Sequence, residues 1–247
     1  DLSMPNNILG FSYVKAILEN NLPIIPLTIK RLKSQYHDNI MESPIASATS
    51  IRKELFTYKK INQSIQTTLP EETVQQLTLY QETSQTWHQW ESYFPILQYR
   101  VLTMTIQELQ QIHGVNEGIE YRIKSTAKNA NSFSQWVEMV KTKRYTWTRI
   151  QRLFAHILTN TKKEDVRSFL DNPTIPYIRV LGITEKGRKY LNNQRKRIEK
   201  PIVFNYSRNN VRMLELEERV SLAYYSILSP LVQQTLFKQE LKGPILK

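Results

Sequence analysis

The sequence contains no cysteine, which excludes disulfides, thiolate zinc sites, iron–sulfur clusters and a cysteine nucleophile. Its four histidines, at positions 37, 88, 113 and 156, are far apart and form no metal-binding pair. The six glycines form neither the dinucleotide-binding fingerprint nor a P-loop. No nucleophile with an adjacent base is recognisable either. We therefore expect no metal centre, and any nucleotide must be bound without these two motifs.

Long apolar runs are missing too. No run approaches the length of a bilayer span, and no charged-then-apolar leader opens the chain. The absence of cysteine fits a reducing compartment. We expect a soluble, cytoplasmic protein with no membrane partner. Because the first residue is Asp1 rather than methionine, we also expect the sequence to be a piece of a longer chain.

What the sequence does have is positive charge. Among its 247 residues, 34 Lys and Arg outweigh 22 Asp and Glu, for a net charge of +12. The 40% hydrophobic content, with 4 Trp, 13 Tyr and 8 Phe, excludes a disordered tail. Basic side chains gain affinity for nucleic acid by releasing condensed counterions, so a polyanion partner is favoured. The alternative is a basic surface that only keeps the protein soluble.

Residues 1–56 predict a helix, a strand, a loop and a second helix. The first helix spans 5–20, where a Pro-Asn-Asn turn precedes apolar residues at helical spacing. Residues 24–30 have the length and composition of a strand, although Pro26 weakens that prediction. The second helix begins near Thr49. A lone strand leaves backbone groups unpaired, so we expect this to be the edge of an α/β domain whose other strands precede Asp1.

From residue 57 onward the pattern is mainly helical. The expected helices span 71–81, 84–104, 106–113, 116–129, 132–141, 146–160, 163–171, about 185–196 and 211–229. Strands at 177–183 and 201–204 flank the helix that starts at 185, which predicts a small βαβ unit. The tail is expected to fray after Pro230. The fold class is therefore α/β plus mostly helical, with a domain boundary near residue 56.

The first candidate site lies in the segment Ala46-Ser47-Ala48-Thr49-Ser50-Ile51-Arg52. Small hydroxyl residues precede a helix, and Arg52 follows Thr49 by one helical turn. Hydroxyls, unpaired N–H groups and a guanidinium together suit a phosphate. Taken alone, the pattern favours a plain capped surface helix, because Ser and Thr caps are common.

A second pair is Asn6, at a helix entrance, and Arg31, just after the expected strand. Ligands of open α/β sheets bind at the carboxyl ends of strands, which points to a ligand here. The alternative roles are a helix cap and a solvated charge, and without further context these are favoured.

A third candidate is the basic stretch from 141 to 152. Between Arg122 and Arg152 eight Lys or Arg face one acid, Glu138. On the expected helix, Arg149, Arg152 and His156 share a basic face opposite an apolar one. The RNA-binding candidates are Lys141, Lys143, Arg144, Tyr145, Arg149 and Arg152.

Cations interleaved with Tyr145 and Trp147 suit phosphate contacts and base stacking. The alternative is a solvated helix face with core aromatics, and we expect Trp147 in the core in either case. The net charge favours RNA binding. A second basic cluster between residues 186 and 200 either extends this surface or forms a solvent-facing helix.

Five separated motifs together resemble the bacterial tRNA(Met) cytidine acetate ligases. The front motifs are the sequences at 5–13, 29–31 and 46–52, in this order and spacing. The rear ones are at 143–153 and 179–188, and the match extends to about residue 190. The resemblance implies that 1–56 are the C-terminal portion of a nucleotidyltransferase-like, Rossmann-type ATP-binding domain. It also implies that 57–247 form a mainly helical tRNA-binding domain.

The resemblance further implies an activity. The family uses ATP, here expected with Mg²⁺, to activate acetate as acetyl-adenylate, and acetylates N4 of the wobble cytidine in elongator tRNA-Met. Asn6 and Arg31 match family positions that contact ATP. Ser47, Thr49 and Arg52 match the S-x-T-x-I-R element that holds the nucleotide phosphates.

One departure from the family pattern is large. The H-x-G-H element, which contacts ATP and the transition state in such enzymes, does not occur in this sequence. We therefore expect this chain alone to be inactive and a preceding segment to complete it. The alternatives are a non-catalytic basic helical RNA-binding module and an adenylyltransferase acting on a small molecule. The basic second half argues against the last.

Overall fold

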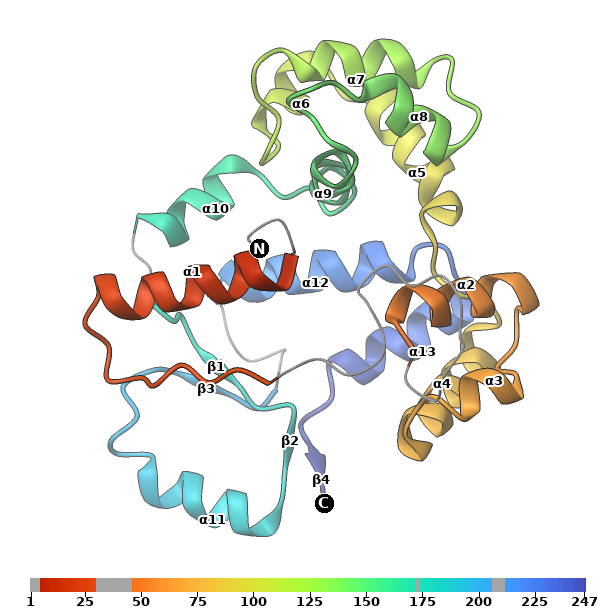
Figure 1. Cartoon of the computed structure of the whole chain (residues 1–247). Coiled ribbons are helices and arrows are strands. Elements are labelled where there is room, and N and C mark those ends of the chain that lie inside the picture. Colours follow the sequence, from red (N-terminus) through yellow and green to blue (C-terminus); the bar gives the residue numbers. More distant parts are fainter. Residues whose placement is uncertain (1–4, 30–45, 172–173, 206–211) are drawn as a thin grey trace. The chain divides into compact units, whose positions relative to one another are not determined.

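The computed structural model describes residues 5–29, 46–171, 174–205 and 212–247. These residues are largely helical (Figure 1). The chain divides into two compact units, residues 1–75 and 76–247, so the boundary expected near 56 falls inside the first unit. Each unit is described by itself below.

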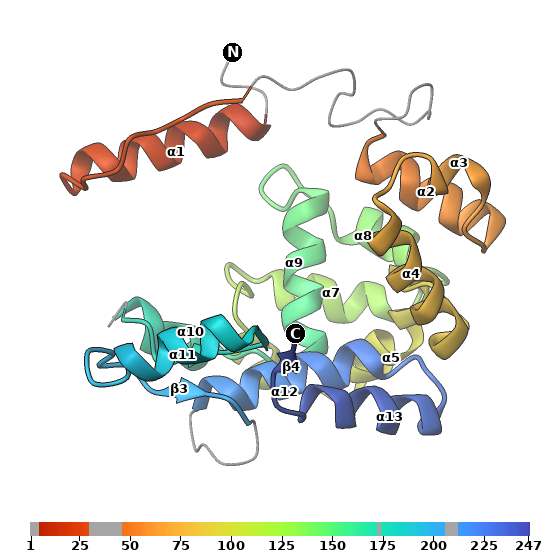
Figure 2. The same cartoon turned by 90° about the horizontal axis from the view of Figure 1, so that it is seen from below.

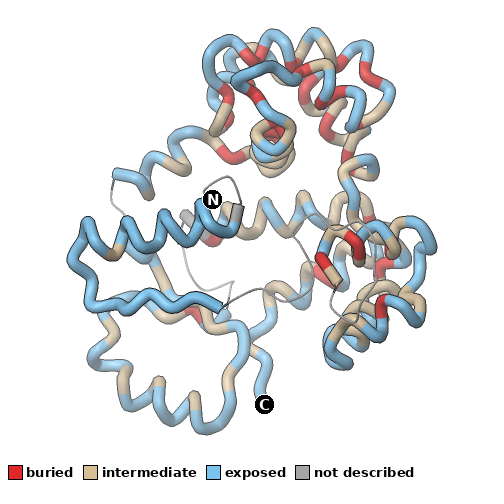
Figure 3. The backbone as a smooth tube through the Cα atoms, in the orientation of Figure 1, coloured by how far each residue is buried: buried red, intermediate tan, exposed pale blue. Residues whose placement is uncertain are grey.

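The first unit begins with α1 (Pro5–Glu19), which confirms the expected N-terminal helix. The strand expected at 24–30 is not formed over its described residues, 24–29, which run extended alongside α1 (Figures 1 and 2). The described residues supply no neighbouring strand to pair with them, and Pro26 has no N–H to donate. Nearly all of α1 and this extended segment is exposed, with Ile29 97% accessible (Figure 3).

The unit continues with α2 (Ala48–Tyr58) and α3 (Gln63–Gln66). α2 confirms the helix expected near Thr49 and ends at Lys59, whose φ of 55° is left-handed. The short α3 was not predicted. Its cap residue Asn62 accepts a hydrogen bond from the N–H of Ile65 at 3.0 Å and donates one to Glu54 at 2.7 Å. Asn62 therefore caps the start of α3 and links α3 to α2 through Glu54.

The next helix, α4 (Glu71–Ser84), crosses from the first unit into the second. The helices that follow are α5 (Trp90–Thr103), α6 (Ile106–Gln111), α7 (Ile119–Ala127), α8 (Phe133–Val140), α9 (Trp147–Leu158) and α10 (Lys163–Leu170). All of them were predicted; α4 runs to Ser84, beyond its predicted end at 81, and the others are shorter than predicted. α5 starts six residues later than expected because the chain turns after Ser84, where Gln85 has a φ of 55°.

Helices α5 to α9 enclose the main hydrophobic core. Its largest fully buried side chains include Trp136 and Phe154, whose rings lie 4.6 Å apart. Glu91 on α5 joins this core to the start of α8, accepting hydrogen bonds from the N–H groups of Phe133 and Ser134 at 2.8 and 3.0 Å. These bonds pair N–H groups that a helix start leaves free.

The βαβ unit expected near 177–204 is confirmed in reduced form. β1 (Ile178–Arg179) pairs in parallel with β3 (Ile202–Val203), and α11 (Glu185–Gln194) lies between them in sequence. Two residues after β1 the chain forms β2 (Gly182–Ile183), which pairs in parallel with β4 (Ile245–Leu246). The second unit thus holds two separate two-stranded sheets among its described residues.

The C-terminal region corrects one expectation. After α12 (Arg212–Tyr225), the tail expected to fray forms α13 (Pro230–Glu240) and then β4. Pro230 begins α13, a position where proline is favoured because a helix start needs no N–H there. None of the helices seen in the described ranges has the length and apolar character needed to cross a membrane.

Candidate phosphate and RNA-binding sites

The start of α2 carries three of the five residues expected to contact a nucleotide. Ser47 is the N-cap and is only 2% exposed. Its Oγ accepts a hydrogen bond from the N–H of Ser50 at 3.1 Å, and the Ser50 hydroxyl donates to the Ser47 carbonyl at 2.9 Å. The cap interpretation of Ser47 is therefore confirmed, and its hydroxyl is engaged in holding the first turn.

Thr49 and Arg52 are placed differently from the cap. Thr49 is half-buried and Arg52 is exposed, one helical turn apart on α2. The N–H groups of Ala48 and Thr49 have no hydrogen-bond partner in the part of the chain described. A helix N-terminus with free N–H groups, a hydroxyl and a guanidinium can bind a phosphate.

The other two nucleotide candidates are less defined. Asn6 is exposed in the first turn of α1, so it stands inside the helix rather than at its cap. Arg31 lies outside the described residues. The structure therefore joins Ser47, Thr49 and Arg52 on one helix start and leaves Asn6 and Arg31 as expectations.

In the expected RNA-binding stretch, the structure corrects the role of one aromatic residue. Tyr145 is 4% exposed, and its hydroxyl donates to the Asn116 carbonyl at 2.8 Å. Arg149 covers its ring, with Cζ 3.9 Å from the ring centroid. In this arrangement the Tyr145 ring is part of the protein interior and offers no free face to a base. Trp147 packs against the core, as expected.

Two of the candidate cations already have acidic partners. Lys141 pairs with Glu138 at 3.2 Å and Arg144 with Glu117 at 3.4 Å. Both pairs are exposed, and exposed pairs stabilise a protein little. An RNA phosphate can therefore replace these carboxylates at small cost.

Within the stretch 122–152, the exposed cations without a partner among the described residues are Lys128, Lys143 and Arg152. Two further cations of the same stretch serve the fold. Arg122 donates to the carbonyl of Met139 at 3.0 Å, and Lys124 donates to carbonyls at the end of α5, including that of Val101 at 3.2 Å. The eight cations counted from the sequence thus divide into those that bind backbone carbonyls, those paired with acids and those without a partner among the described residues.

His156 does not belong to the basic face expected on α9. Burial lowers its pKa, and the nearby His113 and Arg152 lower it further. Its ring meets that of His113 edge-on, with centroids 4.9 Å apart. The neutral imidazole is therefore favoured, and Arg152 remains as the exposed cation of this face.

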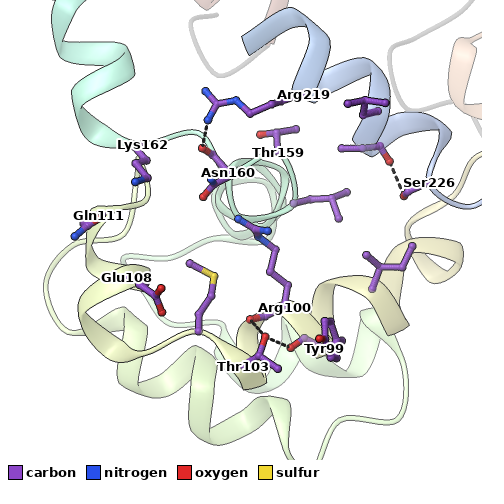
Figure 4. Close-up of a pocket in the computed structure, with 15 residues that line it drawn as sticks. Tyr99, Arg100, Thr103, Glu108, Gln111, Thr159, Asn160, Lys162, Arg219 and Ser226 are labelled. Atoms are coloured by element: carbon purple, nitrogen blue, oxygen red, sulfur yellow. Dashed lines mark hydrogen bonds between the residues drawn. The ribbon is translucent and has the colours of Figure 1, made fainter. Parts of the chain in front are cut away.

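One cavity was not anticipated from the sequence. It has a volume of about 940 Å³ and lies among α5, α9 and α12, with Arg100 and Arg219 on its wall (Figure 4). These helices are far apart along the chain, so no local sequence motif predicts the cavity. Among the described residues no cluster of three or more His, Asp or Glu side chains could hold a metal ion.

Comparison with known proteins gives concordant results. The family described as HIGH Nucleotidyl Transferase matches residues 1–240. The tRNA(Met) cytidine acetate ligase of Oceanobacillus iheyensis is 51% identical over 246 residues, covering 100% of this chain and 61% of the relative. The ligase of that name from a Bacillus cereus strain is 44% identical over 242 residues, covering 98% of this chain and 62% of the relative.

Two solved structures are similar to this chain along nearly its whole length. A crystal structure of Thermotoga maritima TmcAL without ligand has a TM-score of 0.83 at 27% identity, covering 99% of this chain and 61% of that one. A second, bound with alpha-thio ATP, has a TM-score of 0.80 at 27% identity, with coverages of 99% and 60%. The chain therefore spans about three-fifths of the length of the relatives it matches.

Proposed function

This chain belongs to the HIGH nucleotidyl transferase family, and on that premise we propose that it is the C-terminal portion of a tRNA(Met) cytidine acetate ligase. The observation that carries the proposal is the 51% identity to the Oceanobacillus iheyensis ligase across the whole chain. In the proposed reaction, an acetate oxygen attacks the α-phosphate of ATP and pyrophosphate leaves. The N4 amine of the wobble cytidine of elongator tRNA-Met then attacks the acetyl carbonyl, and AMP leaves.

The proposed phosphate site is the start of α2. Its free N–H groups, the Thr49 hydroxyl and the exposed Arg52 would stabilise the negative charge that develops on departing pyrophosphate. Ser47 contributes by fixing the first turn, because its hydroxyl is engaged in the cap. Asn6 and Arg31 complete the proposed ATP contacts. The TmcAL structure bound with alpha-thio ATP supports a nucleotide site in this fold.

We propose that Mg²⁺ arrives with the ATP phosphates rather than in a site of its own. The first turn of α2 carries no acidic residue. Mg²⁺ in nucleotide sites is commonly held through phosphates and water with few protein carboxylates, which fits this composition. Acetate is the proposed co-substrate.

We further propose that a preceding segment carries the H-x-G-H element and completes the sheet. No such element occurs in the 247 residues. The extended residues 24–29 and α1 expose many apolar side chains, including Ile25, Leu27 and Phe11. Apolar surface of this extent marks a face that another structure covers. Strands of the preceding segment would pair with 24–29 and bury this face.

For the tRNA, the proposed contacts are the exposed cations of the second unit. Lys143 and Arg152 are available directly, while Lys141 and Arg144 exchange their acidic partners for phosphates. Arg149 supports this surface from below by holding the 144–145 turn.

The test compares two proteins incubated with ATP, acetate and tRNA-Met. One is this chain alone, and the other is this chain joined behind the N-terminal two-fifths of the Oceanobacillus iheyensis ligase. Mass spectrometry of the digested tRNA should find acetylcytidine only with the joined protein. Acetylcytidine formed by this chain alone would refute the need for the preceding segment.

A second candidate, a non-catalytic RNA-binding module, is favoured by the net charge of +12 and by the absent H-x-G-H element. It predicts that the joined protein binds tRNA-Met yet forms no acetylcytidine. The same experiment therefore separates the two functions.

A further inference from the structure

The cavity among α5, α9 and α12 is lined by both polar and apolar side chains, and two of the apolar ones, Met104 and Leu158, pack against the main core. Arg100 comes from α5, Arg219 from α12 and Lys162 from the start of α10 (Figure 4). Its volume of about 940 Å³ is in the range of sites that bind small molecules. The cavity thus brings together three cations from three separate segments of the second unit.

Arg100 and Arg219 differ in their hydrogen-bond partners. The Nε of Arg100 is buried without a hydrogen-bond partner, and among the described residues no carboxylate lies within ion-pair distance of it. The Nε of Arg219 is likewise without a partner, but its two terminal nitrogens donate to the Asn160 carbonyl and to Asp165, both at 3.0 Å. Arg219 is therefore held by the fold, while the Arg100 guanidinium is left for a ligand.

Glu108, the single acid that the described residues place on the cavity wall, is held in a helix cap. Glu108 accepts hydrogen bonds from the backbone N–H and the hydroxyl of Thr105, at 2.7 and 2.9 Å, as part of a helix cap. Burial lowers the pKa of Arg100; the charge of Glu108 opposes this effect and that of Arg219 adds to it. The cavity consequently has a positive excess that an anion would relieve.

An aromatic pocket adjoins the cavity. It has a volume of about 300 Å³ and is lined by His88, Trp90, Tyr93 and Tyr224. His88 stacks on one side of Tyr224, with ring centroids 3.9 Å apart, and Phe133 stacks on one side of Trp90, at 4.6 Å. The two hollows share Leu158, Thr159 and Ala223 as lining residues. Tyr93 and Arg100 are seven residues apart on α5, roughly 10 Å at 1.5 Å per residue. An apolar aromatic pocket therefore stands close to a cationic one along the same helix.

We propose that the groove formed by α5, α9 and α12 binds a single-stranded segment of RNA, with one phosphate at Arg100 and a neighbouring base in the aromatic pocket. Single strands are recognised by this pairing of cations for phosphates and aromatic rings for bases. The inference rests on the proposed function only in taking RNA as the ligand. Tyr99, exposed on the cavity wall beside Arg100, offers a further surface for a base.

The test measures binding of a short fluorescein-labelled single-stranded RNA by fluorescence polarisation, with neither ATP nor acetate present. Arg100→Gln should weaken binding about tenfold, the value of a lost charge-assisted contact, and should lower the salt dependence by about one counterion. The matched control is Arg167→Gln on α10, an exposed arginine outside the groove, which removes the same charge. It should change affinity less than about twofold.

Three further comparisons test the base pocket, the kind of ligand and the role of Arg100. An RNA of the same length with abasic positions should bind several-fold more weakly, and AMP or inorganic phosphate should compete only weakly. Arg100→Lys should recover part of the affinity, and both Arg100 variants should melt within a few degrees of the parent, which separates a binding role from a structural one.

Equal losses in the Arg100→Gln and Arg167→Gln variants would overturn the groove as the site. Equal binding of intact and abasic RNA would overturn the base pocket. AMP binding as tightly as the strand would replace the RNA with a free nucleotide. Because no acetylation is measured, failure of this proposal is distinguishable from failure of the proposed ligase function.

Discussion

Arg149 lies over the ring of Tyr145, and its Nη1 donates to the carbonyl of Arg144 at 3.0 Å. The guanidinium therefore holds the turn that precedes α9. A cation that looks like an RNA contact in the sequence serves the local fold, and its neighbour Arg152 points to solvent. The two arginines, three residues apart on one helix, are a natural matched pair.

The first prediction separates this pair. Arg149→Ala removes a cation–π contact and a charged hydrogen bond, so it should lower stability by about 1–2 kcal/mol and the melting temperature by roughly 3–6 °C. Arg152→Ala should leave the melting temperature unchanged but lower tRNA affinity and its salt dependence. Thermal melting and tRNA titrations at several salt concentrations measure both effects. Loss of stability in the Arg152 variant would contradict this assignment.

The second prediction concerns the start of α2. Ser47→Ala removes the cap, so it should destabilise the helix start by about 1 kcal/mol. Hydrogen exchange at the Ser50 amide, which Ser47 now holds, should accelerate about fivefold. Thr49→Ala is the control, because its hydroxyl makes no hydrogen bond within the described chain. If both variants accelerated exchange equally, the Ser47 cap would not be what fixes this turn.

The third prediction rests on a hydrogen-bonded histidine. The Tyr93 hydroxyl donates to the Tyr224 carbonyl at 2.8 Å, so it accepts from Nδ1–H of His88. Nε2 of His88 then accepts from the Tyr80 hydroxyl, and the His88 ring stacks on Tyr224 with centroids 3.9 Å apart. Neutral imidazole satisfies every donor and acceptor in this chain of contacts.

Burial lowers the pKa of His88 from 6.5 to about 4. Between these values the unfolded chain binds more protons than the folded one, so stability should fall as the pH drops from 6.5 to 4. A fully buried group would lose about 1.4 kcal/mol of stability for each pH unit of the shift. Because the His88 ring is only half-buried, we expect a smaller total loss of about 2 kcal/mol. Urea unfolding at pH 7 and pH 4.5 measures it. His88→Gln should flatten this dependence, and an unchanged slope in that variant would assign the effect elsewhere.

The helices could largely be predicted from the sequence because their signals are local. Apolar spacing and caps marked α1, α2 and most helices from α4 onward. The tail expected to fray after Pro230 forms a helix instead, because proline is favoured at a helix start. The segment at 24–29 fails as a strand because strand formation needs a partner, which the described residues do not contain.

The site was harder to predict, and for a physical reason. The sequence placed Thr49 and Arg52 correctly one turn apart, since that spacing is a property of a single helix. It could not tell that Tyr145 is covered by Arg149 or that Lys124 binds carbonyls of α5, because both depend on packing. The Arg100 cavity depends on three distant helices and had no local signal.

The proposed phosphate site is tested most directly by acetate-dependent exchange of labelled pyrophosphate into ATP, measured on this chain joined to the N-terminal part of its Oceanobacillus iheyensis relative. Arg52→Ala should slow the exchange at least about tenfold, since a charged phosphate contact is lost. Arg167→Ala, an exposed arginine on α10, should leave the rate unchanged. An unaltered exchange rate in the Arg52 variant would contradict the claim that the start of α2 holds the phosphates.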